Sequence, residues 1–237
     1  MILNDDLKKE ILTHAKEESP KECCGLIIVR KGRKRYKPCK NVSDVPKETF
    51  VLAINDYVKA EEEGEIIAVV HSHPFERPEP SIGDKVACEK SNLPWIIVNP
   101  TIEEWGYCEP SGFELPLVGR EFNFGIVDCY SLVRDYFKQE LNIEIRDYFR
   151  EDKFWEKGNS LYEDNYDKEG FRKVLLNEIQ KHDVLLIHLE ANLPNHAAVY
   201  LGDQQILHHV QGRLSSRDIL GEYYIKNTAF VARHNTL

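Results

Sequence analysis

The spacing of apolar residues changes several times along the first half of the chain. The segment DDLKKEILTHAKEES, residues 5–19, places its apolar side chains on one face and predicts a helix with acidic residues in its first turn. Short apolar runs follow at residues 25–29, 50–54 and 66–70, and WIIVNP and EWGYCEP have the pattern of two further strands. Helices are expected at residues 55–63 and after Ser81. Together these segments predict an α/β domain.

The second half begins after the Pro- and Gly-bearing stretch Glu109–Gly119. DCYSLVRDYFKQEL, residues 128–141, is amphipathic and predicts a helix, and a second helix is expected near Glu169–Lys181. DVLLIHLE, NHAAVYLGD, QQILHHV and TAFVARH then predict a run of short strands separated by turns. We therefore expect an α+β / α/β protein of two domains, over residues 1–110 and 118–237.

Charge narrows the range of partners. The 237 residues carry 31 Lys and Arg against 40 Asp and Glu, a formal net charge of −9. Such a balance argues against nucleic acid or an anionic membrane as the main partner. The one basic run, RKGRKRYK at Arg30–Lys37, is expected to be the solvated turn of a hairpin rather than a binding patch.

The cysteines and the N-terminal residues indicate the cellular compartment in which the chain is made. Six cysteines are present without a Cys-x-x-Cys pair or a compact disulfide framework. MILNDDLKKE lacks the basic-then-apolar order of a secretion signal, and no apolar run approaches the length of a membrane span. We therefore expect synthesis in a reducing cytoplasm, with mostly inert thiols.

The stretch HSHPFERPEPSIGD, residues 71–84, carries the first group of candidate functional residues. His71 and His73 continue the apolar run EIIAVV, and side chains two residues apart share one face of a strand. Ser81 and Asp84 have the spacing of a capping box at the start of a helix, which alone would explain those two residues. The four residues together instead favour a metal site, because two imidazoles and a carboxylate hold a catalytic zinc with one position open.

One further carboxylate completes a known pattern. Glu22 lies in PKECCG, and with HSHP, Ser81 and Asp84 at these spacings it resembles the motif of the JAMM (MPN) metallopeptidases. The resemblance covers the N-terminal half and implies a cytidine-deaminase-like sheet with flanking helices. It also implies Zn²⁺ as the cofactor, held by His71, His73 and Asp84. Glu22 would be the general base, and Ser81 would hydrogen-bond the oxyanion of the reaction intermediate.

The second half carries a candidate nucleophile. Cys129 directly follows Asp128 at the head of the amphipathic helix, where a helix N-terminus is expected to lower the pKa of a thiol. A base must lie near a nucleophilic cysteine and be oriented by a third group. His196 opens the strand HAAVYLG, and His208 and His209 follow on the next strand.

These features resemble the NlpC-type papain-like peptidases, whose motif has Asp-Cys at a helix start and His-x-x-Val-Tyr-x-Gly on a strand. The resemblance implies Cys129 as nucleophile and His196 as base. The orienting residue of the family lies twelve positions after the histidine, which is His208 here. His209 stays open as the alternative, because the register of a hairpin could exchange the two.

Two departures from that family concern oxyanion stabilisation. The small residues that usually follow the cysteine are replaced by Tyr130 and Ser131. The tyrosine that often precedes the nucleophile has no counterpart, since REFNFG offers only Phe122 and Phe124, which have no hydroxyl. The sequence therefore assigns no donor to the oxyanion.

The order of the two domains resembles the tail tip assembly proteins of lambda-like siphophages. The resemblance implies other phage tail tip proteins as partners, and location in the host cytoplasm during assembly or at the virion tail tip. The first hypothesis is an enzyme with two amide hydrolase sites, a zinc (iso)peptidase and a cysteine endopeptidase that cuts the peptide stems of peptidoglycan. The alternative is a structural component of the tail tip with little or no catalytic activity.

Overall fold

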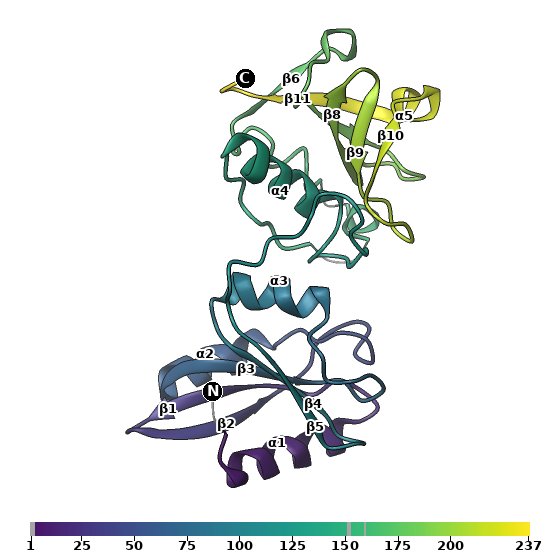
Figure 1. Ribbon diagram of the computed structural model, residues 1–237. Helices are drawn as coiled ribbons and strands as arrows, with labels where there is room; N and C mark the ends of the chain where they lie inside the picture. The colour runs from purple at the N-terminus through teal and green to yellow at the C-terminus, as the bar shows by residue number, and fades with distance from the viewer. Residues whose placement is uncertain (1–2, 151–152, 159) are drawn as a thin grey trace. The chain divides into compact units, whose positions relative to one another are not determined.

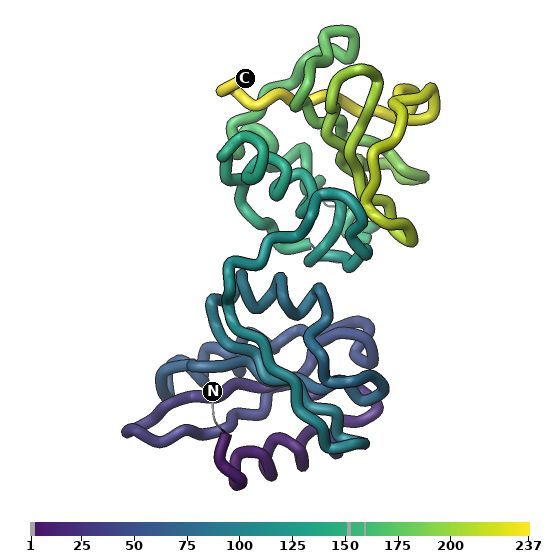
Figure 2. Tube along the Cα trace, viewed as in Figure 1, coloured from purple at the N-terminus to yellow at the C-terminus, as the bar shows by residue number. Residues whose placement is uncertain are grey.

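The computed structural model describes residues 3–150, 153–158 and 160–237. The chain divides into two compact units, Met1–Glu114 and Leu115–Leu237 (Figures 1 and 2). Each unit has its own sheet and its own hydrophobic core.

The described part of the first unit is built on one five-stranded sheet with the order β2-β1-β3-β4-β5. The strands are β1 (Cys24–Arg30), β2 (Arg33–Cys39), β3 (Glu65–Ser72), β4 (Trp95–Asn99) and β5 (Glu104–Cys108). Only the β3–β4 pair is parallel among these neighbours, so the chain crosses over the sheet between them through a helix.

Helices cover both faces of this sheet (Figure 1). They are α1 (Asp5–Glu18), α2 (Ile54–Glu63) and α3 (Ile82–Ser91). Alternate residues of β1 point to opposite faces, so Ile27 packs in the cluster that contains Ile11 of α1, while Leu26 packs with Ala60 of α2. The central strands are thus buried on both sides.

The basic run Arg30–Lys37 and the apolar run at residues 50–54 differ in how far they follow the sequence prediction. The basic run forms the β1–β2 hairpin, whose turn has positive φ at Lys31 and Gly32. Residues 50–54 do not form a strand: Leu52 makes one isolated bridge to Asn41, and α2 begins at Ile54.

The second unit contains, within its described residues, a six-stranded sheet with the order β10-β9-β8-β7-β11-β6. All of its strand pairs are antiparallel. The strands are β6 (Phe171–Val174), β7 (Val184–Ile187), β8 (His196–Gly202), β9 (Gln205–His208), β10 (Ser216–Ile219) and β11 (Thr228–His234). The helical elements are α4 (Cys129–Leu141), α5 (Glu222–Asn227) and the 3-10 turns Phe154–Lys157 and Leu176–Glu178.

The amphipathic helix α4 packs on one face of this sheet, with Phe137 against Leu186 and Val199 in one core cluster. A second cluster lies on the other face of the sheet and includes Leu185 and Ile206. The start of α4 is therefore held next to the central strands. Among the described helices of the whole chain, none is both long and apolar enough to cross a membrane.

The prediction of a helix near Glu169–Lys181 is wrong. Gly170 has φ of +80°, and the chain then forms β6, which pairs with β11 at the edge of the sheet. Only the 3-10 turn Leu176–Glu178 is helical in that segment. Apolar residues spaced three and four apart resembled a helix face, but pairing with an available sheet edge overrides that local pattern.

Candidate functional site

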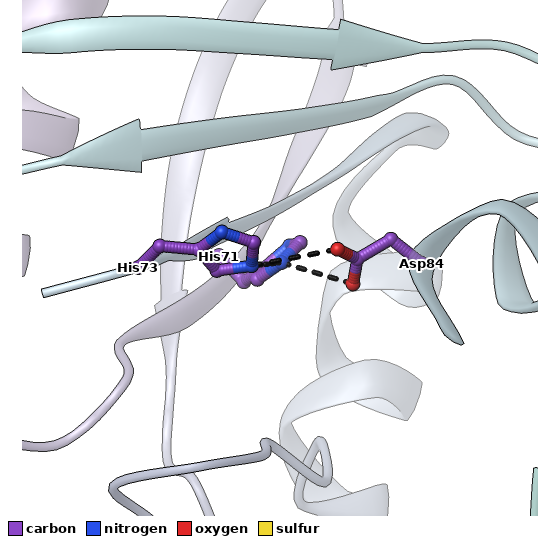
Figure 3. A group of neighbouring side chains, drawn as sticks. All are labelled: His71, His73 and Asp84. Atoms are coloured by element: carbon purple, nitrogen blue, oxygen red, sulfur yellow. Dashed lines mark hydrogen bonds and ion pairs between the residues drawn. The ribbon is translucent and has the colours of Figure 1, made fainter. Parts of the chain in front are cut away.

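Three polar side chains of the first unit meet at the end of β3. His71 is the penultimate residue of that strand, His73 follows its end, and Asp84 lies in the first turn of α3. The Nε2 atoms of the two histidines are 3.1 Å apart, and Asp84 Oδ1 and Oδ2 lie 3.2 Å from His71 Nε2 and 3.4 Å from His73 Nε2 (Figure 3). All three side chains are buried, and their donor atoms converge closely enough to share one metal ion.

The start of α3 explains how Asp84 is aimed. Ser81 is the N-cap, its Oγ accepts from the Asp84 backbone N–H at 3.1 Å, and the Asp84 carboxylate accepts from the Ser81 N–H at 2.8 Å. The capping box and the histidine contacts therefore coexist in one carboxylate. Burial acts to raise the pKa of Asp84, but hydrogen bonds from His71 and His73 outweigh it and hold that pKa well below its usual range.

The two imidazole rings are held by different surroundings. His73 Nδ1 lies 3.1 Å from the backbone oxygen of Arg77, which fixes the ring and leaves Nε2 toward Asp84. The ring of His71 stacks on Phe50, with centroids 4.7 Å apart, and meets Trp95 edge-on at 5.4 Å. Its buried Nδ1 has no hydrogen-bond partner among the described residues. Aromatic packing and the contact of its Nε2 with Asp84 thus orient His71, without a hydrogen bond at Nδ1.

Glu22 lies two residues before β1 and is buried. Its backbone is tied to the segment after β2, since its N–H donates to Pro46 O at 2.7 Å and its carbonyl accepts from Asn41 Nδ2 at 3.0 Å. Burial raises the pKa of its carboxyl to about 7, with the charge of His73 opposing and that of Asp84 reinforcing the shift. The carboxyl therefore lies within electrostatic reach of the histidine–aspartate group.

In the second unit, Cys129 is the first residue of α4 and is 8% exposed. Its Sγ lies 3.3 Å from the Tyr162 hydroxyl, and the backbone N–H of Ala197, next to His196, also interacts with the sulfur. The expected lowering of its pKa is wrong. Burial raises the pKa of the thiol to about 11 and the Asp128 charge adds to this, so the helix N-terminus and the Tyr162 hydrogen bond are outweighed.

The strand histidines form a hydrogen-bonded row. His196 Nε2 lies 3.2 Å from His208 Nδ1, and His208 Nε2 lies 2.8 Å from Asp218 Oδ2. His209 points elsewhere, since its ring meets Phe122 at 5.0 Å and neither of its buried nitrogens has a partner in the described part of the chain. Of the two alternatives, His208 is the residue that the fold brings to His196.

Cys129 and His196 share no hydrogen bond in the described structure, although Sγ interacts with the N–H of the residue after His196. Burial is the main cause that lowers the pKa of His196 to about 3, and the nearby His208 and His209 lower it further. Both groups are therefore uncharged at neutral pH. The resting pair is a thiol and a neutral imidazole rather than a thiolate and an imidazolium.

Sequence reasoning missed two side chains of this site. Tyr162 belongs to a stretch of mostly turns between α4 and β6, where no periodic pattern fixes which residue reaches the thiol. Asp218 lies on β10, a short strand whose polar sequence SRDI carries no strand signal. The turn residue Gly212, just before β10, is a local feature that could have indicated a further hairpin strand.

Comparison with known families matches each unit separately. The model of the prokaryotic homologs of the JAB domain matches residues 4–107, and the NlpC/P60 family model matches residues 119–233. The expected fold class is thereby confirmed: an N-terminal JAB (MPN) domain and a C-terminal NlpC/P60 domain, each with its own mixed α/β structure.

Two relatives match over most of this chain. The tail tip assembly protein K of Escherichia phage N15 is 38% identical over 226 residues, 94% of this chain and 92% of the relative. The tail tip assembly protein K of Escherichia phage lambda is 39% identical over 184 residues, 77% of this chain and 89% of the relative. A crystal structure of an NlpC/P60 family protein from Bacillus cereus is 14% identical with a TM-score of 0.37, covering 95% of this chain and 66% of that one.

Proposed function

Because the chain belongs to the family of tail tip assembly protein K, we propose that it is a tail tip assembly protein with two amide hydrolase sites. The N-terminal site would be a zinc (iso)peptidase acting on a protein of the assembling or infecting particle. The C-terminal site would be a cysteine endopeptidase that cuts peptide stems of peptidoglycan and so aids passage through the cell wall. Other tail tip proteins would be its binding partners.

The donor set of the N-terminal site fits zinc. His71, His73 and Asp84 offer two imidazole nitrogens and one carboxylate, which is a set used by catalytic zinc sites with an open position. The low pKa of Asp84 keeps that carboxylate charged, as a metal ligand requires. A zinc ion bound there would lower the pKa of a coordinated water to about 7 and polarise a carbonyl oxygen.

Glu22 and Ser81 supply the remaining groups of this site. Glu22 would take a proton at its carboxylate and pass it to the leaving amine, and its pKa of about 7 suits a group that must both accept and release a proton near neutral pH. The Ser81 Oγ caps α3 next to Asp84 and would donate its hydroxyl hydrogen to the developing oxyanion.

The C-terminal site is proposed to act by general-base attack. Cys129 Sγ would add to the carbonyl carbon of the stem peptide while His196 takes the thiol proton. The amine would leave with that proton, and water would then cleave the thioester. Because the resting thiol is neutral, proton removal accompanies attack rather than preceding it.

Tyr162 is the proposed oxyanion donor that the sequence left unassigned. Its hydroxyl lies 3.3 Å from Sγ, so it lies beside the carbon that the sulfur would attack. The backbone N–H of Ala197, which also approaches the sulfur, would be the second donor. A hydroxyl from the segment after α4 would thus take the part played in the family by a tyrosine before the nucleophile.

The contact of Cys129 with Tyr162 and β8 carries this proposal, and digestion of purified peptidoglycan by the full chain tests it. We expect new free peptide termini, detected by mass analysis of the soluble fragments. Cys129→Ala should release none, while Glu22→Gln, altered only in the other unit, should cut as the unaltered chain does. Intact peptidoglycan after treatment with the unaltered chain would contradict the cysteine peptidase.

One observation favours a structural role instead. Cys129 and His196 are only 8% and 3% exposed, so their side chains also serve as packing between α4 and β8. In that case the chain would act in tail tip assembly without cutting peptidoglycan. Phage carrying Cys129→Ala would then plate with normal efficiency, whereas the enzyme predicts normal tails that adsorb but deliver DNA poorly.

A further inference from the structure

Three neighbouring strands of the C-terminal sheet align one row of side chains. His196 is on β8, His208 on β9 and Asp218 on β10. His208 lies opposite Ala198, two residues after His196, and opposite Ser216, two residues before Asp218. Side chains two residues apart share a face of a strand, so the diagonal placement brings all three to the same face.

The hydrogen bonds of this row can be assigned a direction. An ionised carboxylate only accepts hydrogen bonds, so His208 Nε2, 2.8 Å from Asp218 Oδ2, must carry a hydrogen. Burial lowers the pKa of His208 against the opposing hydrogen bond and charge of Asp218, which favours the neutral imidazole, and a neutral imidazole has one N–H. His208 Nδ1 is then an acceptor, and His196 Nε2, 3.2 Å away, must be the donor to it.

These two hydrogen bonds leave Nδ1 of His196 with a free lone pair. With its hydrogen on Nε2, His196 has an unprotonated Nδ1, which is the state that a base for the Cys129 thiol requires. In the opposite arrangement Nδ1 would carry the hydrogen, and it could not accept the thiol proton. The choice between the two tautomers depends on whether an acceptor stands at the far end of the row.

We propose that Asp218 is a positioning residue of the cysteine site, which acts through His208 to hold His196 in the tautomer with the hydrogen on Nε2. The inference rests on the proposed peptidase for its purpose, and on the two hydrogen bonds of the row for its geometry. In the reaction, the thiol proton passes from Cys129 to Nδ1 of His196 and later to the leaving amine, so Asp218 itself gains and loses no proton.

The neighbours of Asp218 support this role. Arg213 Nη2 lies 3.2 Å from the same Oδ2, so a cation helps to keep the carboxylate ionised. The Tyr224 ring packs edge-on against His208, with centroids 5.1 Å apart. The Asp218 side chain is 29% exposed while His208 is fully buried, so the row runs from the solvent edge to the buried base.

The test measures tautomers in the full chain by two-bond nitrogen–proton correlation spectra of the histidine rings. Signals of His196 and His208 are assigned by their loss in His196→Gln and His208→Gln. In the unaltered chain we expect both rings with the hydrogen on Nε2. A His196 ring with its hydrogen on Nδ1 would overturn the proposal without any variant that might fail to fold.

The variant Asp218→Ala removes the acceptor, and we expect the share of the Nδ1–H form of His196 to rise. Peptidoglycan cleavage should then fall in kcat by about tenfold or more with little change in KM, because Asp218 contacts no substrate. Asp218→Glu, which restores a carboxylate, should recover part of the rate. Arg217→Ala, on the same strand, should leave the His196 tautomer and the cleavage rate unchanged.

The His196 tautomer and the rate of peptidoglycan cleavage test the role of Asp218 and the proposed peptidase separately. If the tautomer shifts in Asp218→Ala but the unaltered chain cuts no peptidoglycan, the peptidase fails while the role of Asp218 in fixing the tautomer stands. If peptidoglycan is cut and Asp218→Ala leaves the tautomer and the rate unchanged, the role of Asp218 is overturned and the peptidase stands.

Discussion

Arg150 and Asp128 form a buried ion pair immediately before the candidate nucleophile. Arg150 Nε lies 2.8 Å from Asp128 Oδ2, and Arg150 Nη2 lies 3.3 Å from Oδ1. The Asp128 carboxylate also accepts from the backbone N–H groups of Ser131 and Gly125, both at 2.9 Å. One carboxylate thus joins the N-cap of α4, the preceding turn and a distant guanidinium, and these contacts fix the backbone that carries Cys129.

Removal of the guanidinium should destabilise the C-terminal unit strongly. Arg150→Met leaves the Asp128 carboxylate buried without its counter-ion, and we expect the free energy of unfolding to fall by about 3–5 kcal/mol. Arg146→Met is the matched control, because Arg146 is 78% exposed and lies 3.8 Å from Glu169 Oε1. That control should cost less than about 1 kcal/mol. Denaturant unfolding of both variants measures the difference, and equal small losses would contradict the importance of the buried pair.

The effect of the Tyr162 hydroxyl on Cys129 should be measurable through the rate at which the thiol is alkylated. Its hydrogen bond stabilises the thiolate, so Tyr162→Phe should raise the thiol pKa further above about 11. A hydrogen bond to a charged group contributes about 1.5–3 kcal/mol, or about one to two pKa units, so labelling by iodoacetamide at a fixed pH should slow about tenfold or more.

The measurement is the rate of Cys129 alkylation against pH, read by peptide mass mapping. Tyr166→Phe is the control, because Tyr166 is a nearby tyrosine whose ring packs on Phe230 rather than on the thiol. It should leave the rate of labelling unchanged. The same slowing in both variants would mean that packing, and not the Tyr162 hydroxyl, controls the thiol.

The grouping at the end of β3 could be foreseen because it depends on short-range geometry. His71 and His73 share a strand face, and Asp84 follows at the start of the next helix, so the whole group spans only fourteen residues. The capping box at Ser81 is likewise local. Glu22 was found only through the family resemblance, because a single glutamate before a strand has no local signal for the site.

The cysteine site could be foreseen only in part, because it depends on contacts between distant segments. Cys129 and His196 follow local patterns, a helix start and a strand start. Tyr162 reaches the site from a stretch of turns, and Asp218 reaches it from a short polar strand, and sequence periodicity describes neither segment. The direction of the Cys129 pKa shift was wrong for the same reason, since the shift is set mainly by burial in the folded unit.

Loss of a proposed zinc ligand and loss of the proposed general base should have different effects on metal content. The unaltered chain should hold about one zinc ion, and His73→Ala should lose it because two ligands rarely retain a catalytic zinc. Glu22→Gln should keep the metal and lose only the N-terminal reaction, because Glu22 is proposed to move protons rather than to bind zinc. Elemental analysis of dialysed protein measures both. Stoichiometric zinc in His73→Ala would refute the ligand assignment.

The buried, neutral His196 should make the stability of the C-terminal unit depend on pH. Burial lowers its pKa to about 3 in the folded chain, against an ordinary value of 6.5. Between these values the unfolded chain binds a proton that the folded chain does not, so stability falls as pH decreases below 6.5. Above pH 6.5 His196 causes no such loss, and below pH 6.5 the loss in the free energy of unfolding grows by about 1.4 kcal/mol per pH unit.

His196→Gln isolates this effect, because glutamine is polar but does not titrate. Other groups titrate in both proteins, so the difference between their unfolding free energies should change by about 2 kcal/mol between pH 7 and pH 5, in favour of the variant at the lower pH. Urea unfolding at several pH values measures that difference. If it stayed constant over the range, the pKa of His196 would be the same in the folded and the unfolded chain, and burial would not lower it.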